Sequence, residues 1–388
     1  MQTPVYLDHH ATTPVDPRVL EAMLPYFGPK FGNAASRTHH FGWETEKAVE
    51  RARQQVASLI GAEPREIVFT SGATESNNLA LKGVMEAAGS RGNHIVTMAT
   101  EHRAVLDPIA HLGRHGAATT ILQSQPDGRL ELEQLRAAIR PETVVVSVMY
   151  ANNEIGVMQP VEEIGAICRE RGAVFHCDAA QAVGKEKFQV EDQNIDFISF
   201  TAHKLYGPKG IGALYIRRHS PIRLTAQMDG GGHEFGYRSG TLNVPAIVGF
   251  GAACAICTEE REAEARRIRT LRDALLMRLQ SALDGVAVNG SLERRLAGNL
   301  NVTFKDVDAS ALLMSLPEVA VSTGSACSSA VPAPSHVLLA LGLSPEAARS
   351  SVRFGLGRFN TEEEIDYAAG RIIEAVRKLR SSRPILAR

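Results

Sequence analysis

Short apolar runs alternate with longer amphipathic segments through the first half of the chain. The apolar runs predict buried strands, because their continuous valine, isoleucine and phenylalanine content leaves no polar face. These runs cover residues 67–70, 94–99, 119–122, 143–149 and 173–177 and open the segment 195–212. The amphipathic segments predict helices from 17, over 43–60 and 74–88, from 103, and over 132–139 and 160–171. Such alternation predicts an α/β fold in which helices cover a mostly parallel sheet.

The pattern changes after about Val244, where a long helical segment rich in alanine and charge runs toward Leu283. Shorter elements follow, at 300–304, 319–322 and 351–354, and a charged amphipathic helix over about 362–379 ends the fold. We therefore expect two domains. The large domain covers residues 15–258, and a smaller α+β domain is formed by residues 259–388 together with residues 1–14.

Composition narrows the class of protein without naming a function. The 388 residues are 44% hydrophobic and 22% charged, with a net charge of -1, so neither nucleic acid nor a membrane surface is expected as a partner. There is no apolar run long enough to span a bilayer, and the start of the chain does not resemble a signal peptide. The five cysteines are mostly scattered, which indicates a reducing compartment and a cytoplasmic protein.

A lysine stands just beyond the apolar run that opens the segment 195–212, where the sequence reads Thr201-Ala202-His203-Lys204. Burial past the end of a strand lowers the pKa of a lysine, and a neutral amine can form a Schiff base with an aldehyde. Thr201 and His203 could donate hydrogen bonds to a phosphate beside it. Taken alone, a surface lysine in a strand-to-loop turn explains these residues equally well.

Polar residues follow other predicted strands as well. Thr74 stands at the start of a helix, where backbone N–H groups can bind an anion, and His102 could stack on a flat ring or move protons. Asn153 and Asp178 follow two further strands. Singly, each is explained by a helix cap or a structural histidine. Together with Lys204 they lie where such sheets bind ligands, and they match the phosphate, ring, ring nitrogen and aldehyde of pyridoxal 5'-phosphate.

Several short motifs then point to one family. They are Asp8-x-x-Ala11-Thr12-Thr13, Thr70-Ser71-Gly72-Ala73-Thr74-Glu75, Thr100-Glu101-His102, Asn152-Asn153-Glu154-Ile155-Gly156, Asp178-x-x-Gln181, His203-Lys204 and Ser322-Thr323-Gly324-Ser325-Ala326-Cys327. With them the chain resembles, over nearly its whole length, the cysteine desulfurases of the NifS/IscS type, which are class V aminotransferases of pyridoxal-phosphate fold type I. The resemblance implies a seven-stranded, mostly parallel sheet and a homodimer with shared sites.

The resemblance also implies a role for each matching residue. Lys204 would carry the cofactor covalently, Asp178 would pair with the ring nitrogen, and His102 would stack on the ring and assist proton transfer. The implied cofactor-binding residues are Ala73, Thr74, His102, Asn153, Asp178, Gln181, Thr201, His203, Lys204 and Thr241, the last acting on the other subunit. Asn153 and Arg353 would bind the substrate, with the guanidinium gripping its carboxylate.

Cys327 is implied as the catalytic sulfur acceptor. It stands in the small-residue run 325–330, which a proline-bounded segment follows, and this context is typical of a mobile loop with an accessible thiol. No metal site is expected, apart from Cys327 as a candidate iron–sulfur ligand. The remaining cysteines are interpreted as packing residues, namely Cys168, Cys177 and the pair Cys254 and Cys257.

The implied activity is removal of sulfur from L-cysteine, giving L-alanine and a persulfide on Cys327 for an iron–sulfur scaffold or a sulfur-carrier protein. Selenocysteine lyase, or another β-lyase with the same cofactor, would use the same cofactor residues. A non-catalytic scaffold is the alternative from another class, although both the lysine and the acceptor cysteine are present. Three residues, His9, His10 and Phe235, depart from what members often carry, and each could alter substrate access.

Overall fold

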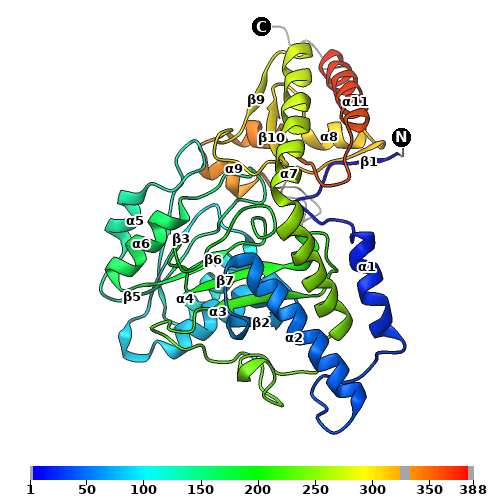
Figure 1. Ribbon diagram of the computed structural model, residues 1–388. Coiled ribbons are helices and arrows are strands. Elements are labelled where there is room, and N and C mark those ends of the chain that lie inside the picture. Colours follow the sequence, from blue (N-terminus) through cyan, green and yellow to red (C-terminus); the bar gives the residue numbers. More distant parts are fainter. Residues whose placement is uncertain (1–2, 324–332, 383–388) are drawn as a thin grey trace.

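A seven-stranded sheet forms the centre of the protein in the computed structural model, which describes residues 3–323 and 333–382 (Figure 1). The strand order is β2-β8-β7-β6-β5-β3-β4. The strands are β2 Ile67–Thr70, β3 His94–Met98, β4 Ala118–Leu122, β5 Thr143–Ser147, β6 Val174–Asp178, β7 Phe197–Thr201 and β8 Gly212–Ile216. β8 is antiparallel to both of its neighbours and the other pairs are parallel, which confirms the predicted α/β fold.

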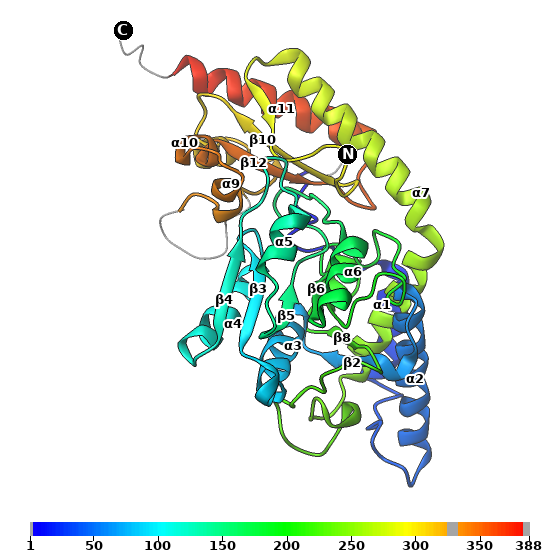
Figure 2. The same cartoon turned by 90° about the vertical axis from the view of Figure 1, so that its left-hand side faces the viewer.

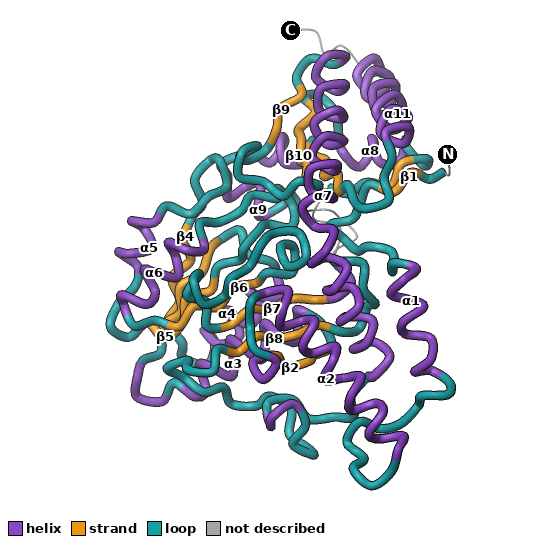
Figure 3. Tube along the Cα trace, viewed as in Figure 1, coloured by secondary structure: helices purple, strands orange, loops and turns teal. Residues whose placement is uncertain are grey.

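Alternate side chains of the central strands enter two separate hydrophobic cores. Phe175 and Phe200 pack on the face covered by α2, α6 and the first part of α7, whereas Val174 and Phe197 pack on the face covered by α3 and α4. Burial on both faces explains why these strands are continuous apolar runs. The covering helices are α2 His40–Ile60, α3 Ala73–Ala87, α4 Arg103–Arg114, α5 Leu132–Ala138, α6 Val161–Arg171 and α7 Val244–Ala282. Figure 3 shows the strands enclosed by helices.

A smaller three-stranded antiparallel sheet, in the order β12-β10-β9, lies at the other end of α7. Its core joins the second half of α7 to α11, through side chains such as Leu279, Phe304 and Ile372. The elements are β9 Val286–Val288, β10 Asn299–Phe304, α8 Ala309–Met314, α9 His336–Ala340, α10 Pro345–Arg349, β12 Ser351–Gly355 and α11 Glu362–Ser381. Near the N-terminus, β1 Val5–Tyr6 pairs with β11 Val319–Ala320, and α1 Pro17–Met23 follows.

Helix α7 is 39 residues long and runs along one side of the molecule from the small sheet to the large one (Figure 2). The domain boundary expected between residues 258 and 259 falls inside this single helix. The division of the chain into two domains therefore stays a prediction. None of the described helices combines the length and the apolar content that a bilayer crossing requires.

Candidate active site

A cavity of about 630 Å³ opens where the strands of the large sheet end. The sequence-predicted residues that line it are Ala73, Thr74, His102, Asn153, Asp178, Gln181, Thr201, His203, Lys204 and Arg353. Thr241 lies on an exposed loop and is not among the lining residues, whereas Cys327 lies outside the described part of the chain. The structure thus gathers residues from distant parts of the sequence around one space.

Lys204 ends a 3₁₀ turn, Ala202–Lys204, that follows β7 directly. Its amine donates a hydrogen bond to the main-chain oxygen of His10. The pKa of Lys204 is lowered to about 7, first by burial and then by the neighbouring cations Lys185 and Arg353, while two nearby aspartates raise it less. A large fraction of this amine is therefore neutral near pH 7, which is the form that attacks an aldehyde.

Tyr206, two residues after Lys204, stabilises the turn that carries the lysine. The backbone of Tyr206 has φ +66°, a left-handed conformation that costs energy for a residue with a large side chain. Its N–H donates to the Thr13 hydroxyl at 2.9 Å, and its carbonyl accepts from the N–H of Asp16 at 3.0 Å. These bonds from the N-terminal segment hold the strained backbone in place.

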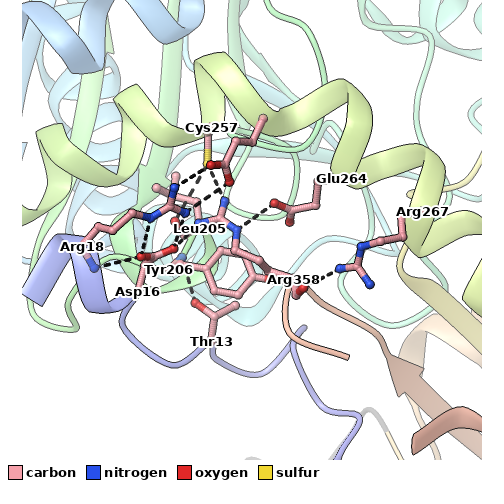
Figure 4. A network of polar contacts seen from close by, with 10 residues as sticks. Thr13, Asp16, Arg18, Leu205, Tyr206, Cys257, Glu264, Arg267 and Arg358 are labelled. Atoms are coloured by element: carbon pink, nitrogen blue, oxygen red, sulfur yellow. Dashed lines mark hydrogen bonds and ion pairs between the residues drawn. The ribbon is translucent and has the colours of Figure 1, made fainter. Parts of the chain in front are cut away.

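Arg358 completes this support (Figure 4). Its guanidinium lies 4.2 Å from the centre of the Tyr206 ring and forms ion pairs of 2.8 Å with Asp16 and with Glu264. Its main-chain N–H also donates to the Tyr206 hydroxyl. The Sγ of Cys257 lies 3.8 Å from the same guanidinium. The charges in this network are thus paired, and the loop after the lysine is fixed.

Asp178 is the last residue of β6, and its carboxylate is almost fully buried at the cavity. One oxygen accepts from the side-chain amide of Asn77 at 2.7 Å, and the other accepts from the N–H of Ala180 at 3.0 Å. Among the described side chains, no lysine or arginine forms an ion pair with it. A protonated ring nitrogen fits this carboxylate. Asn77 was not anticipated from the sequence.

His102 caps the start of α4 and lines the cavity. Its Nδ1 accepts from the N–H of Ala104 at 3.0 Å, so the proton of the neutral ring resides on Nε2. Burial lowers the pKa of His102, which favours this neutral form. A neutral flat ring with one fixed tautomer suits both stacking and proton transfer.

The start of α3 is the predicted site for the phosphate of the cofactor. Gly72 supplies no side-chain cap, so the first N–H groups of the helix, beginning at Ala73, are free to bind an anion. Thr74, Thr201 and His203 line the same cavity. Burial, followed by the charge of Lys204, lowers the pKa of His203 to about 4, so this ring is neutral at pH 7.

Arg353 lies on β12, where two of its nitrogens are already engaged. One donates to Asp8 at 2.7 Å, and another donates to the main-chain oxygen of Asn153 at 2.9 Å. The Nε atom is buried and has no partner among the described residues. An incoming carboxylate would therefore approach a guanidinium that Asp8 has oriented in advance.

The four described cysteines are buried free thiols. Burial raises the pKa of each of them, to about 11 for Cys257 and well above the ordinary range for Cys177 and Cys254. The thiolate is the reactive form, so these side chains are inert packing residues at neutral pH. Within the described residues there is also no group of three or more side chains placed to hold a metal.

Comparison with known proteins agrees with this site. A family model described as Aminotransferase class-V matches residues 5–368. The chain is 58% identical over 385 residues to the cysteine desulfurase IscS of Anaeromyxobacter dehalogenans (strain 2CP-C), which covers 99% of this chain and 95% of the relative. It is 55% identical over 386 residues to the IscS of Methylobacillus flagellatus (strain ATCC 51484 / DSM 6875 / VKM B-1610 / KT), with coverage of 99% and 95%.

Solved structures give the same result. A NifS-like protein superposes with a TM-score of 0.90 at 39% identity, covering 96% of this chain and 99% of that one. A structure titled SspA in complex with cysteine superposes with a TM-score of 0.82 at 37% identity, covering 92% and 100%.

The fold and the lysine site define a pyridoxal-phosphate-dependent enzyme of fold type I, and the chain belongs to the aminotransferase class-V family. Within that family it is a cysteine desulfurase of the NifS/IscS type. The residues present fit the cofactor, because a helix N-terminus, a buried carboxylate and a partly neutral lysine surround one cavity.

Proposed function

We propose that this enzyme transfers the sulfur of L-cysteine to Cys327 and releases L-alanine. The observation that carries the proposal is the placement of Lys204, whose amine is partly neutral at pH 7, in the same cavity as the buried carboxylate of Asp178. In the overall step the carbon–sulfur bond of cysteine breaks and a sulfur–sulfur bond to Cys327 forms, while a proton replaces sulfur on carbon. The IscS relatives and the cysteine-bound SspA structure support L-cysteine as the substrate.

Pyridoxal phosphate, when bound, supplies an electron sink for the charge that develops on the α-carbon. The chain's own residues do the rest. Arg353 orients the substrate carboxylate, and the amine of Lys204, held by His10, removes the α-proton. Asp178 keeps the ring nitrogen protonated, and Asn77 and Ala180 fix the direction of its carboxylate.

The enzyme is also proposed to act as a homodimer. Exposed aromatic side chains occur between α1 and α2 and at the start of α2: Phe27 and Phe31 are 66% and 68% exposed, and Phe41 and Trp43 in α2 are each 48% exposed. Exposed aromatic groups of this kind are typical of protein interfaces. Thr241 is exposed and lies outside its own cavity, which agrees with a role in the site of a second copy. Light scattering of wild type and Phe31→Asp tests this, and an unchanged mass for Phe31→Asp would contradict it.

The recipient of the sulfur is proposed to be an iron–sulfur scaffold or a sulfur-carrier protein in the cytoplasm. The free thiols of Cys168, Cys177, Cys254 and Cys257 support a reducing compartment. A pull-down followed by a persulfide-transfer assay identifies the recipient.

The experiment that tests the activity separates cofactor chemistry from sulfur chemistry. Cys327→Ser should bind pyridoxal phosphate and respond spectrally to L-cysteine, because the described cavity does not depend on that thiol. It should release almost no alanine and gain no persulfide mass, since a serine hydroxyl is a poor nucleophile toward sulfur. Cys168→Ala is the matched control and should behave like wild type.

Alanine release by Cys327→Ser at the wild-type rate, or a persulfide on Cys254 or Cys257, would refute Cys327 as the acceptor. Parallel rates with L-cysteine and L-selenocysteine separate the proposed activity from selenocysteine lyase. A much higher rate with the selenium substrate and no persulfide would contradict the proposal.

A further inference from the structure

A second lysine lies behind the wall of the active-site cavity. Lys185 follows Gln181 by four residues and lines a separate cavity of about 40 Å³. His10 lines both cavities, so it stands between them. Nothing in the proposed reaction uses Lys185, although its charge lies close enough to Lys204 to lower the pKa of that amine.

The side-chain amide of Gln181 connects the two cavities. Its oxygen accepts from Nδ1 of His10 at 2.9 Å and from the amine of Lys185 at 3.3 Å. Its nitrogen donates to the main-chain oxygen of His10 at 2.9 Å. The same main-chain oxygen accepts the hydrogen bond from Lys204. A continuous chain of hydrogen bonds therefore links Lys185 to Lys204.

The charge of Lys185 and the main-chain oxygen of His10 favour the same orientation of the Gln181 amide. An ammonium group can only donate hydrogen bonds, so it requires the amide oxygen on its side. If the amide were rotated by half a turn, its NH₂ group would face the ammonium and its oxygen would face the carbonyl of His10. Both contacts would then be repulsive. Gln181 also lines the active-site cavity, and in the observed orientation only one of its two N–H groups is engaged by His10, so the other is available as a donor to an oxygen of the cofactor ring.

We propose that Lys185 is a positioning residue of the cofactor site: it helps to fix the Gln181 amide as a donor, and it promotes attachment of the cofactor to Lys204. The second part rests on the role of Lys204 under the proposed function. The first part rests on the hydrogen bonds of Gln181 alone.

The groups around Lys185 keep it charged at neutral pH. Burial lowers the pKa of Lys185 to about 8, while Glu264 on α7 and the adjacent Glu186 favour the charged form, and Arg353 opposes it. The charged groups that face Lys204 are Lys185, Arg353, Asp8 and Asp178. Three histidines also interact with it, namely His10, His102 and His203, and burial lowers the pKa of each of them. Near pH 7, therefore, Lys185 is mostly protonated when Lys204 is partly neutral.

The first experiment measures how fast the apoprotein attaches pyridoxal 5'-phosphate between pH 6 and pH 10, from the growth of visible absorption. Lys185→Met should move the pH midpoint upward by about half a unit to one unit, so attachment at pH 7 slows roughly two- to sixfold. Lys185→Arg restores the charge and should return the midpoint toward that of wild type. Lys187→Met removes an exposed lysine two residues away and is the matched control.

The second experiment tests whether Lys185 acts through Gln181. The absorption band of the holoenzyme is compared in Lys185→Met, in Gln181→Ala and in the double variant. Lys185→Met should shift the band of wild type but should add no shift to Gln181→Ala, because the amide that it positions is then absent. Lys185→Gln carries the same expectations and serves if Lys185→Met does not fold.

An unchanged attachment midpoint in folded Lys185→Met, an equal shift in Lys187→Met, or additive band shifts would each overturn the inference. Failure of the proposed function is distinguishable from these outcomes. If Lys204→Ala still attached the cofactor, the assignment of Lys204 itself would fail. If Lys204→Ala attached none while Lys185→Met matched wild type, only the role of Lys185 would be lost.

Discussion

The turn that carries Lys204 has one side that faces the cavity and a rear side that contacts Arg358, and the two sides differ in how their charges are stabilised. On the cavity side, burial and neighbouring positive charge keep His203 neutral and Lys204 partly neutral near pH 7. On the rear side, Arg358 is paired with both Asp16 and Glu264 and remains charged. Both sides are largely buried, but only on the rear side are the charged groups paired with groups of opposite sign.

This difference separates reactivity from support. Burial makes the protonated form of a base less stable, and this raises the reactivity of the base. A buried ion that has a partner of opposite charge is already stabilised by that partner. We therefore expect changes on the cavity side to affect activity more than stability, and changes on the rear side to affect stability more than activity.

The strongest test removes the lysine. Lys204→Ala should lose cofactor attachment and reduce turnover by more than about 10³-fold, because no other described group lies at that place in the cavity. The free energy of unfolding of the apoprotein should not fall, since a buried amine with a lowered pKa is removed. Visible absorption, alanine production and thermal unfolding are the measurements, with Lys187→Ala as control. Attachment that persists and can be fixed by reduction would show that another lysine serves.

Asp178→Asn should keep the fold and lower turnover by roughly 10²- to 10³-fold, because the ring nitrogen loses its negative partner. Asparagine retains an oxygen for the N–H of Ala180, which preserves the shape of the site. Steady-state alanine production, with the cofactor content measured on the same samples, checks this. Activity within a few-fold of wild type would remove Asp178 from the mechanism.

On the rear side, Arg358→Met should lower the free energy of unfolding by about 3 kcal/mol, because Glu264 loses its ion-pair partner and Asp16 keeps only the more exposed Arg18. Arg371→Met breaks two more exposed pairs, with Glu318 and Glu374, and should cost less than about 1 kcal/mol. Denaturant unfolding of the apoprotein compares the two. Equal losses in both variants would break the contrast between the two sides of the turn.

Acid should affect the cavity side before the rear side. The pKa of His203 is lowered to about 4, so the unfolded chain binds more protons than the folded one below pH 6.5, and stability falls as the pH drops. The loss of stability from His203 at pH 5 should be roughly 1 kcal/mol, allowing for its partial exposure, and His203→Asn should remove it.

On the rear side, the bond from Arg18 lowers the pKa of Asp16. The contribution of Asp16 to stability is therefore present above its pKa in the unfolded chain, and it is lost only in much stronger acid. The cost of Arg358→Met should therefore be equal at pH 8 and pH 5.

Much of the site could be predicted from the sequence because a parallel sheet gathers its strand ends. Thr74, His102 and Asp178 each follow a strand, so knowing the strands was enough to place them at one edge. Asn77 is not among the predicted site residues. It stands one helical turn beyond Thr74, and this spacing puts it on the same side of α3. That spacing was a usable signal.

Other features left no such signal. The support from Arg358 joins residues that are 342 positions apart in sequence, and the left-handed backbone of Tyr206 is stabilised only by those distant partners. The role of Lys185 depends on its approach to Gln181 in three dimensions. Strand β8, Gly212–Ile216, is not among the predicted strands, because its short apolar run directly follows a turn of glycine and proline residues.

Helix α7 is continuous in space but should behave as two units in hydrogen exchange. Its buried side chains stop at Cys257 and resume at Ile268, so the stretch between them enters neither hydrophobic core. That stretch is held by its own backbone bonds and by a few ion pairs, including those of Glu260 and Glu264. Amide protons there should exchange with solvent sooner than those at either end, and transient opening at this point would let one core loosen while the other stays intact.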